Sequence, residues 1–262
     1  MNDKKETVDD LRDYKKGEAE KKAIELYNNL KNELFPNKYL KLKEMYQIET
    51  QDFDFSFVAN HKNKISNLDE RVENSIRKKV EERKKRKKET KYKPFNMEKI
   101  IAQFAVKECN NNEQKFDISC IGVFFDFEIP TVKGGKRNID LVSYNEKDSI
   151  LRIIELKQKE NDDDYFKAII ELLDYYIRAK GYDLTNCELK KHPYVKNKKI
   201  NAIKMAILAH SESQIAIDFK ENNYPNIKKI LEFFEIEFYE YTASKHNTIK
   251  EEIIIDSINK LK

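Results

Sequence analysis

Two stretches, Ile139-Asp140-Leu141-Val142-Ser143-Tyr144 and Ile150-Leu151-Arg152-Ile153-Ile154-Glu155-Leu156-Lys157, decide how this sequence can fold. Both are rich in β-branched and apolar residues, and the polar residues between them have the length of a hairpin turn. We therefore predict two antiparallel strands. Within them stand three ionisable groups, those of Asp140, Glu155 and Lys157. Burying such groups without partners is costly, so a sequence that does so is expected to use them.

The register of this predicted hairpin decides whether the three charged groups meet. Side chains alternate between the two faces of a strand, so Glu155 and Lys157 share one face. If Asp140 lies opposite Glu155, the three groups converge at one end of an apolar ladder in which Val142 meets Ile153. A slip of one residue would send the two carboxylates to opposite faces. We take the first register as the hypothesis.

A Glu-x-Lys pattern alone carries little information, because it recurs in this highly charged chain. Other copies, such as Glu20/Lys22, stand in polar or helix-like surroundings. Only Glu155/Lys157 follows an apolar strand and has an aspartate on the preceding strand. The alternative interpretation is an edge strand whose glutamate and lysine face water.

The chemistry that suits this group is phosphodiester hydrolysis. A pair of carboxylates can hold a hard divalent cation, and a neighbouring lysine can orient or activate a water molecule. Other chemistries have less support. The four histidines are scattered, the three cysteines form no Cys-x-x-Cys pair, and there is neither a phosphate-binding glycine loop with its lysine nor a nucleophile elbow.

With these motifs in this order, the chain resembles the PD-(D/E)XK, or restriction-endonuclease-like, nuclease superfamily over roughly residues 96 to 245. The resemblance implies an α/β fold with an α-β-β-β-α-β core, that is, a mixed central sheet flanked by helices. The expected elements are a helix over 96–106, a strand over 121–129, the hairpin, a helix over 162–180, a strand over 202–209, a helix over 225–234 and a strand over 236–241.

The resemblance also assigns roles to the residues of the hairpin. It makes Asp140 and Glu155 metal ligands, with the backbone carbonyl of Leu156 as a further ligand and Mg²⁺ or Mn²⁺ as the cofactor. Lys157 becomes the water-positioning or general-base residue. Ile139 stands where the family pattern has proline, which is a common departure.

Other polar residues are weaker candidates. The first helix of the family often carries a glutamate aimed at the metal, and here Glu98 is the first candidate and Glu108 the second. Glu128 is a further acidic neighbour or, equally, a salt-bridged surface residue. Several branches have Gln-x-x-x-Tyr on the helix after the lysine strand. In this chain Glu171 and Tyr175 stand at those positions, with glutamate in place of glutamine.

A basic run precedes the nuclease-like part. Residues 77–93 hold eleven Lys or Arg against three Glu, a local net charge of +8, whereas the whole chain has a net charge of +4. Such a run is expected to contact phosphates and to add affinity without sequence preference. The alternative is a solvated helix or linker whose charges meet no partner. The residues proposed for nucleic-acid binding are Lys84, Lys85, Arg86, Lys87 and Lys88.

We divide the chain into a mostly helical N-terminal region, residues 1–95, and a nuclease-like domain, residues 96–262. The N-terminal region is interpreted as an appendage for target recognition, a partner or self-association. One apolar stripe predicts a helix that stops at Pro36, a second predicts a following helix, and residues 51–60 alternate like a strand. The stripes are Ala19, Ala23, Ile24, Tyr27, Leu30 and Leu34, then Leu40, Leu42, Met45 and Ile48.

The leading prediction is a metal-dependent nuclease, an endonuclease acting on DNA in restriction, repair or defence. The alternative is a non-catalytic nucleic-acid-binding or scaffold protein that retains the nuclease fold. No signal-peptide core and no run of 18 apolar residues is present, and the cysteines form no pairing pattern, so we expect a cytoplasmic protein without a membrane partner. A homodimer is one expected assembly, since double-strand cleavage by such cores usually calls for two active sites.

Overall fold

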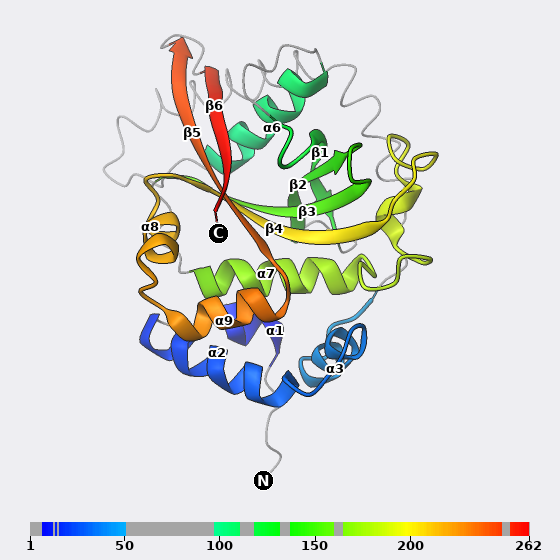
Figure 1. Ribbon diagram of the computed structural model, residues 1–262, viewed down its shortest axis with the longest axis vertical. Helices are drawn as coiled ribbons and strands as arrows, with labels where there is room; N and C mark the ends of the chain where they lie inside the picture. Colours follow the sequence, from blue (N-terminus) through cyan, green and yellow to red (C-terminus); the bar gives the residue numbers. More distant parts are fainter. Residues whose placement is uncertain are drawn as a thin grey trace, which may run out of the picture.

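The computed structural model describes residues 7–12, 14, 16–50, 97–110, 118–131, 137–159, 165–247 and 252–261. Over these residues the chain forms an α/β fold with one six-stranded mixed sheet and helices on both of its faces (Figure 1). The predicted α/β class is therefore confirmed. The basic segment at 77–93 and the strand-like segment at 51–60 lie outside the described residues, as does the predicted domain boundary at 95/96.

The predicted hairpin is present and has the predicted register. Strands β2 (Asn138–Asn145) and β3 (Ile150–Lys157) pair antiparallel, with Val142 opposite Ile153. Ser149 has a φ of 58°, in the left-handed region, which is compatible with a tight turn. Two runs rich in β-branched residues, joined by a short polar turn, thus form two adjacent inner strands of the sheet.

The remaining strands extend this hairpin on both sides. On one side, β1 (Val123–Pro130) pairs antiparallel with β2. On the other, β4 (Ala202–His210) pairs parallel with β3, and β5 (Glu237–Asn247) pairs parallel with β4. The sequence analysis did not predict the sixth strand, β6 (Glu252–Leu261), which pairs antiparallel with β5. The strand order is β1-β2-β3-β4-β5-β6.

Helices cover both faces of the sheet. Helix α6 (Met97–Asn110) packs on one face, mainly against β1 and β6, and α7 (Tyr165–Arg178) packs on the other, against β3 and β4 (Figure 1). Two shorter helices, α8 (Gln214–Glu221) and α9 (Pro225–Phe233), lie in the connection from β4 to β5, and only the second was predicted. A 3-10 turn (Glu188–Lys191) follows α7.

The alternation of side chains along the strands divides the core into two hydrophobic clusters. Ile153 and Ile207 belong to the cluster on the α7 side, whereas Ile154 and Leu208 belong to the cluster on the α6 side. All four side chains are completely buried, and each contributes on the order of 1.5 to 3 kcal/mol of transfer free energy. The central strands are therefore fixed in depth and orientation by two apolar layers.

Three N-terminal helices, α1 (Val8–Arg12), α2 (Lys16–Leu30) and α3 (Asn37–Met45), add a layer beneath α7 and α9 (Figure 1). Helix α2 lies along α9, and the Glu20 carboxylate accepts hydrogen bonds from the backbone N–H groups of Asn226 (2.9 Å) and Ile227 (3.0 Å). These N–H groups belong to the first turn of α9, where a carboxylate is favourable.

The predicted apolar stripes hold only in part. Leu30 is fully buried, but α2 ends there, so the prediction that this helix runs on to Pro36 was wrong, and Leu34 is 80% exposed. In α3, Leu42 is buried whereas Leu40 is 39% exposed and lies outside the core. No helix in the described part of the chain is long and apolar enough to cross a membrane.

Candidate active site

The strands β2 and β3 diverge at the end opposite their turn, and Asp140 stands at the point of divergence. Their backbone pairing runs as far as Leu141 and Ile154. Beyond this pair, the backbone N–H of Leu156 donates to Oδ2 of Asp140 at 2.9 Å. A carboxylate thus replaces a backbone carbonyl in the ladder. Because the N–H and C=O of a strand residue point to the same side, the Leu156 carbonyl also faces β2.

Glu155 and Lys157 lie on the same face of β3, as predicted, and contact one another. The distance from Nζ of Lys157 to Oε1 of Glu155 is 2.8 Å. The same Nζ lies 3.1 Å from Oε2 of Glu171, which α7 presents to the sheet from below. Glu155 is 4% exposed and Lys157 3%. One buried ammonium group is therefore held between two carboxylates from different elements.

Helix α6 brings a further carboxylate to this edge of the sheet from the opposite face. The backbone N–H of Gln158, directly after the lysine strand, donates to Oε1 of Glu98 at 3.4 Å. Glu98 lies in the first turn of α6. Glu108, the second candidate, is ten residues further along the helix, about 15 Å along its axis. Of the two, it is Glu98 that the structure places beside the hairpin.

Burial and mutual repulsion raise the pKa values of the two hairpin carboxyls. Burial raises the pKa of Asp140 to about 7, although the Lys157 ammonium and the N–H of Leu156 act against it. Burial, followed by the charge of Asp140, also raises the pKa of Glu155 well above its usual range. Glu171 adds to both effects. The site therefore brings more carboxyl groups together than one lysine can neutralise.

The pKa of Lys157 moves in the other direction from that of a typical buried lysine. Burial by itself lowers the pKa of the ammonium group, but the surrounding carboxylates outweigh burial and hold it well above its usual value. The largest contributions come from Glu155 and Glu171, with Glu98 and Asp140 behind them. Lys157 is therefore a permanent cation at neutral pH.

These residues fit a hard divalent cation. Oε2 of Glu155 is buried and makes no hydrogen bond to the described residues. Mg²⁺ prefers oxygen ligands and is usually held by one or two carboxylates together with waters and substrate phosphates. Asp140, Glu155 and the Leu156 carbonyl supply such a set. In the described ranges, no three His, Cys, Asp or Glu side chains are grouped to hold an ion by themselves.

Two other predicted site residues have described positions, Glu128 and Tyr175. Glu128 of β1 forms an ion pair with Lys99 of α6, as expected for a salt-bridged residue. Tyr175 lies one helical turn beyond Glu171 on α7 and is buried in the core cluster. The five basic residues at 84–88 lie outside the described part of the chain.

Sequence reasoning did not single out Gln158 or Tyr241, which support the lysine strand. Oε1 of Gln158 is buried and has no hydrogen-bond partner among the described residues. The hydroxyl of Tyr241, from β5, donates to the carbonyl of Lys157 at 3.4 Å. Gln158 directly follows the Glu-x-Lys pattern, which is a local signal. Tyr241 is 84 residues away along the chain, and only the fold reveals its contact with Lys157.

Comparison with known proteins gives one partial match. The family DUF234, described as "Archaea bacterial proteins of unknown function", matches residues 55–169, less than half of the chain. The matched segment contains Glu98, Asp140, Glu155 and Lys157 and ends before Glu171. No curated protein matches the chain, and no solved structure matches it.

Proposed function

We propose that this protein is a metal-dependent nuclease of the PD-(D/E)XK type that hydrolyses phosphodiester bonds in DNA. The observation that carries the proposal is the convergence of Asp140, Glu155 and Lys157 where β2 and β3 separate. The element order α6-β1-β2-β3-α7-β4, with three antiparallel strands followed by a parallel one, supports the same superfamily.

The metal ligands in this proposal are the carboxylates of Asp140 and Glu155 and the carbonyl of Leu156. A bound Mg²⁺ or Mn²⁺ ion supplies Lewis-acid chemistry, polarising the phosphoryl oxygen and lowering the pKa of water. Asp140 remains tied to β3 through the N–H of Leu156, so its free oxygen is held in a fixed direction. Glu155 offers the buried oxygen that lacks a hydrogen bond.

Lys157 acts in this scheme through its positive charge. The surrounding carboxylates hold the pKa of Lys157 well above its usual value, so the metal-free site contains an ammonium group at neutral pH. Held by Glu155 and Glu171, the ammonium group can orient the attacking water or stabilise negative charge that develops on the phosphate.

The two helical glutamates are positioning residues in the proposal. Glu171 fixes the Lys157 ammonium group from α7, and Glu98 accepts the N–H of Gln158 from α6. Both helices pack on the sheet through buried apolar faces, so these two carboxylates are held by rigid elements. The end of the hairpin that carries Glu155 and Lys157 is thereby held by α7 on one face of the sheet and by α6 on the other.

The basic run at 77–93 is proposed to bind the DNA backbone. Neutralising about five phosphates would give a slope of about −4 to −5 in a plot of log affinity against log salt on duplex DNA. Binding to different sequences would be equally weakened by salt, since phosphate contacts carry no sequence information.

The direct test is incubation of the purified protein with supercoiled plasmid and Mg²⁺ or Mn²⁺, with and without EDTA. Glu155→Gln, which keeps the shape but removes the charge, is expected to abolish cleavage. The matched control is Glu146→Gln, since Glu146 lies in the turn at the other end of the same hairpin, where its exposed carboxylate pairs with Lys198. That variant is expected to cleave like the wild-type protein.

Two results would contradict the proposal. One is the absence of metal-dependent nicking together with no effect of Mg²⁺ or Mn²⁺ on thermal stability. The other is cleavage that survives Glu155→Gln unchanged, which would point to a contaminating nuclease. The first result would favour a nucleic-acid-binding or scaffold protein that keeps this fold.

A further inference from the structure

Three buried side-chain oxygens at the end of the hairpin that carries Asp140 make no hydrogen bond to the described residues. They are Oδ1 of Asn138, Oε2 of Glu155 and Oε1 of Gln158. Asn138 is the first residue of β2, two residues before Asp140, and Gln158 directly follows Lys157 at the end of β3. A buried acceptor without a donor costs free energy, so three of them in one place require an explanation.

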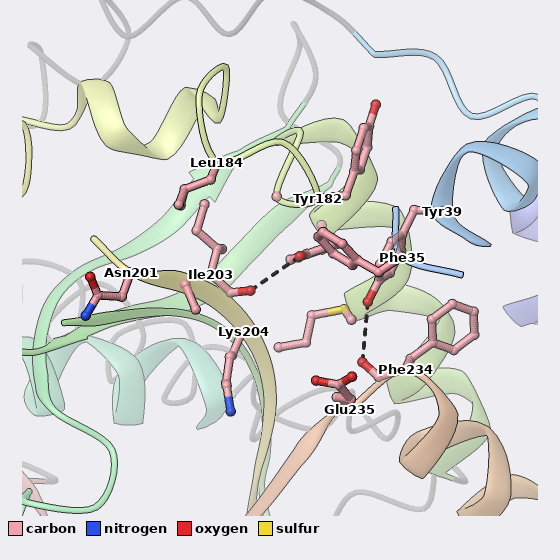
Figure 2. Close-up of a pocket in the computed structure, with 13 residues that line it drawn as sticks. Phe35, Tyr39, Tyr182, Leu184, Asn201, Ile203, Lys204, Phe234 and Glu235 are labelled. Atoms are coloured by element: carbon pink, nitrogen blue, oxygen red, sulfur yellow. Dashed lines mark hydrogen bonds between the residues drawn. The ribbon is translucent and has the colours of Figure 1, made fainter. Parts of the chain in front are cut away.

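Other buried polar groups of the fold do find partners. A hollow at the other end of β4 is lined by aromatic side chains that include Tyr39 of α3 and Tyr176 of α7 (Figure 2). The hydroxyl of Tyr39 donates to the carbonyl of Phe234 at 3.4 Å, and that of Tyr176 donates to the carbonyl of Ile203 at 3.3 Å. Enclosure alone therefore does not leave a side chain without a hydrogen bond in this fold.

The amide at the turn end of the same hairpin is also fully used. Nδ2 of Asn145, the last residue of β2, donates to the carbonyl of Ser119 at 2.9 Å. Its Oδ1 accepts the backbone N–H of Lys147 at 3.0 Å. The two ends of β2 thus each carry an asparagine, and it is the oxygen of the one near the carboxylate group that has no donor among the described residues.

Asn138 and Gln158 lie on the α6 side of the sheet, where Glu98 also lies. Ile139 packs in the α7-side cluster, so the alternation of side chains directs its neighbour Asn138 toward the α6 side. Leu156 packs in the α6-side cluster, and Gln158 follows it by two residues. The backbone N–H of Gln158 donates to Glu98 of α6. Two neutral oxygen acceptors therefore stand on one face beside the proposed metal ligands.

We propose that Asn138 and Gln158 accept hydrogen bonds from the water molecules that a hydrated Mg²⁺ ion keeps when Asp140 and Glu155 bind it. This inference rests on the proposed metal site and adds two positioning residues to it. Mg²⁺ gives up its waters reluctantly and usually keeps several of them in a protein site. Each of these waters is a hydrogen-bond donor, and a buried amide oxygen without a donor is a suitable acceptor for it.

The neutral charge of the two amides suits the charge of this site. The carboxyl groups of Glu155, Glu171, Glu98 and Asp140 already surround Lys157. A further carboxylate would add repulsion, whereas an amide oxygen accepts a hydrogen bond without adding charge. The amides can thus hold the waters of the ion at no further electrostatic cost to the metal-free fold.

The test is thermal unfolding followed by circular dichroism, first in EDTA and then over a titration with Mg²⁺. In Asn138→Leu and Gln158→Met an apolar side chain of similar size replaces the amide, so no buried acceptor is left without a donor. Each variant is expected to unfold about 2 to 4 °C above the wild-type protein in EDTA. Each is also expected to bind Mg²⁺ at least about 3-fold more weakly, and the double variant at least about 10-fold more weakly.

Two further variants separate this role from a structural one. Gln158→Glu keeps an acceptor and adds a charge, so it should bind Mg²⁺ at least as tightly as the wild-type protein and unfold at a lower temperature in EDTA. The matched control is Asn145→Leu, which removes an amide whose hydrogen bonds are all made within the chain. It should unfold at a lower temperature in EDTA and bind Mg²⁺ as the wild-type protein does.

The outcomes distinguish this inference from the proposed function. Equal stabilisation of the wild-type protein and of both amide variants by Mg²⁺ would overturn the inference and leave the metal site in place. A loss of affinity for a labelled DNA duplex in Asn138→Leu and Gln158→Met, with Mg²⁺ binding unchanged, would also overturn it, because the amides would then contact the nucleic acid. A wild-type protein that neither Mg²⁺ nor Mn²⁺ stabilises would refute the metal site itself and this inference with it.

Discussion

Replacing Asp140 by asparagine probes the buried charge cluster without removing the hydrogen bond that Asp140 makes. The asparagine oxygen can still accept the N–H of Leu156, which lies 2.9 Å from the present carboxylate. The substitution therefore removes the charge and keeps the connection between β2 and β3. Two effects should follow, a gain in stability in the absence of metal and a loss of metal binding.

The size of the stability gain follows from the pKa of Asp140. Its usual value of 3.8 is raised to about 7 in the folded chain, so ionising this carboxyl on folding costs at most about 4 kcal/mol. The side chain is only partly buried, and screening by water reduces this figure. We expect Asp140→Asn to be more stable than the wild-type protein by about 1 to 3 kcal/mol above pH 7.

The pH dependence of this gain has a definite direction. Below about pH 4 the carboxyl is protonated in both the folded and the unfolded chain, so the two proteins should differ little. Between about pH 4 and 7 the unfolded chain releases the proton that the folded chain retains. The stability of the wild-type protein, relative to the variant, is therefore lost as the pH rises through this window and stays low above it.

Urea unfolding in EDTA at about pH 5 and about pH 8.5 measures this difference. Addition of Mg²⁺ at the higher pH should stabilise the wild-type protein and leave the variant unchanged, because the variant lacks one ligand. A gain of 2 kcal/mol corresponds to a rise in Tm of about 4 to 8 °C for a chain of this size. A variant that is less stable than the wild type at the higher pH, or a gain equal at both pH values, would refute the reasoning.

Three further substitutions test other parts of the argument. Lys157→Met leaves buried carboxylates without their cation and should cost about 3 to 5 kcal/mol at neutral pH; thermal melts should show part of that loss recovered as the pH falls and the carboxyls take up protons. Gly122→Ala should cost more than about 2 kcal/mol in urea unfolding, because Gly122 has a φ of +92° and a Cβ there would lie 2.6 Å from the Tyr144 carbonyl. Glu20→Ala should cost about 1 to 2 kcal/mol, since it removes the acceptor for two N–H groups of α9; equal stability of this variant would show that the N-terminal helices are held by apolar contacts alone.

The hairpin was predictable because its information is local. A strand has a period of two, so the register that places Val142 opposite Ile153 also places Tyr144 opposite Leu151 on the same face. The same alternation places Glu155 and Lys157 together. Helices α6, α7 and α9 were predictable for a similar reason, since each shows an apolar stripe between clear end signals.

The features that could not be predicted depend on contacts between distant parts of the chain. Strand β6 buries only Ile255 and Ile258 among its fully described side chains, so its sequence lacks the pattern of a central strand. Leu34 lies beyond the end of α2 at Leu30, whereas the apolar spacing alone predicted that the helix continues to Pro36. The contact between Glu171 and Lys157 depends on how α7 packs against β3, and the sequence alone does not give that packing.

The cluster was visible in the sequence and is costly in the fold for the same reason. Glu155 and Lys157 are charged residues in a strand whose other residues are mostly apolar, and such a conflict is visible in the sequence. In the structure the same residues show its cost. The pKa values of Asp140 and Glu155 are raised, and Oε2 of Glu155 is buried without a hydrogen bond to the described residues. A bound divalent cation would offset both costs, because it would add positive charge beside the carboxylates and would be coordinated by that oxygen. The metal-free fold is therefore expected to be less stable than the metal-bound fold. The addition of Mg²⁺ to the wild-type protein at the higher pH, with Asp140→Asn as the comparison, measures this difference in stability.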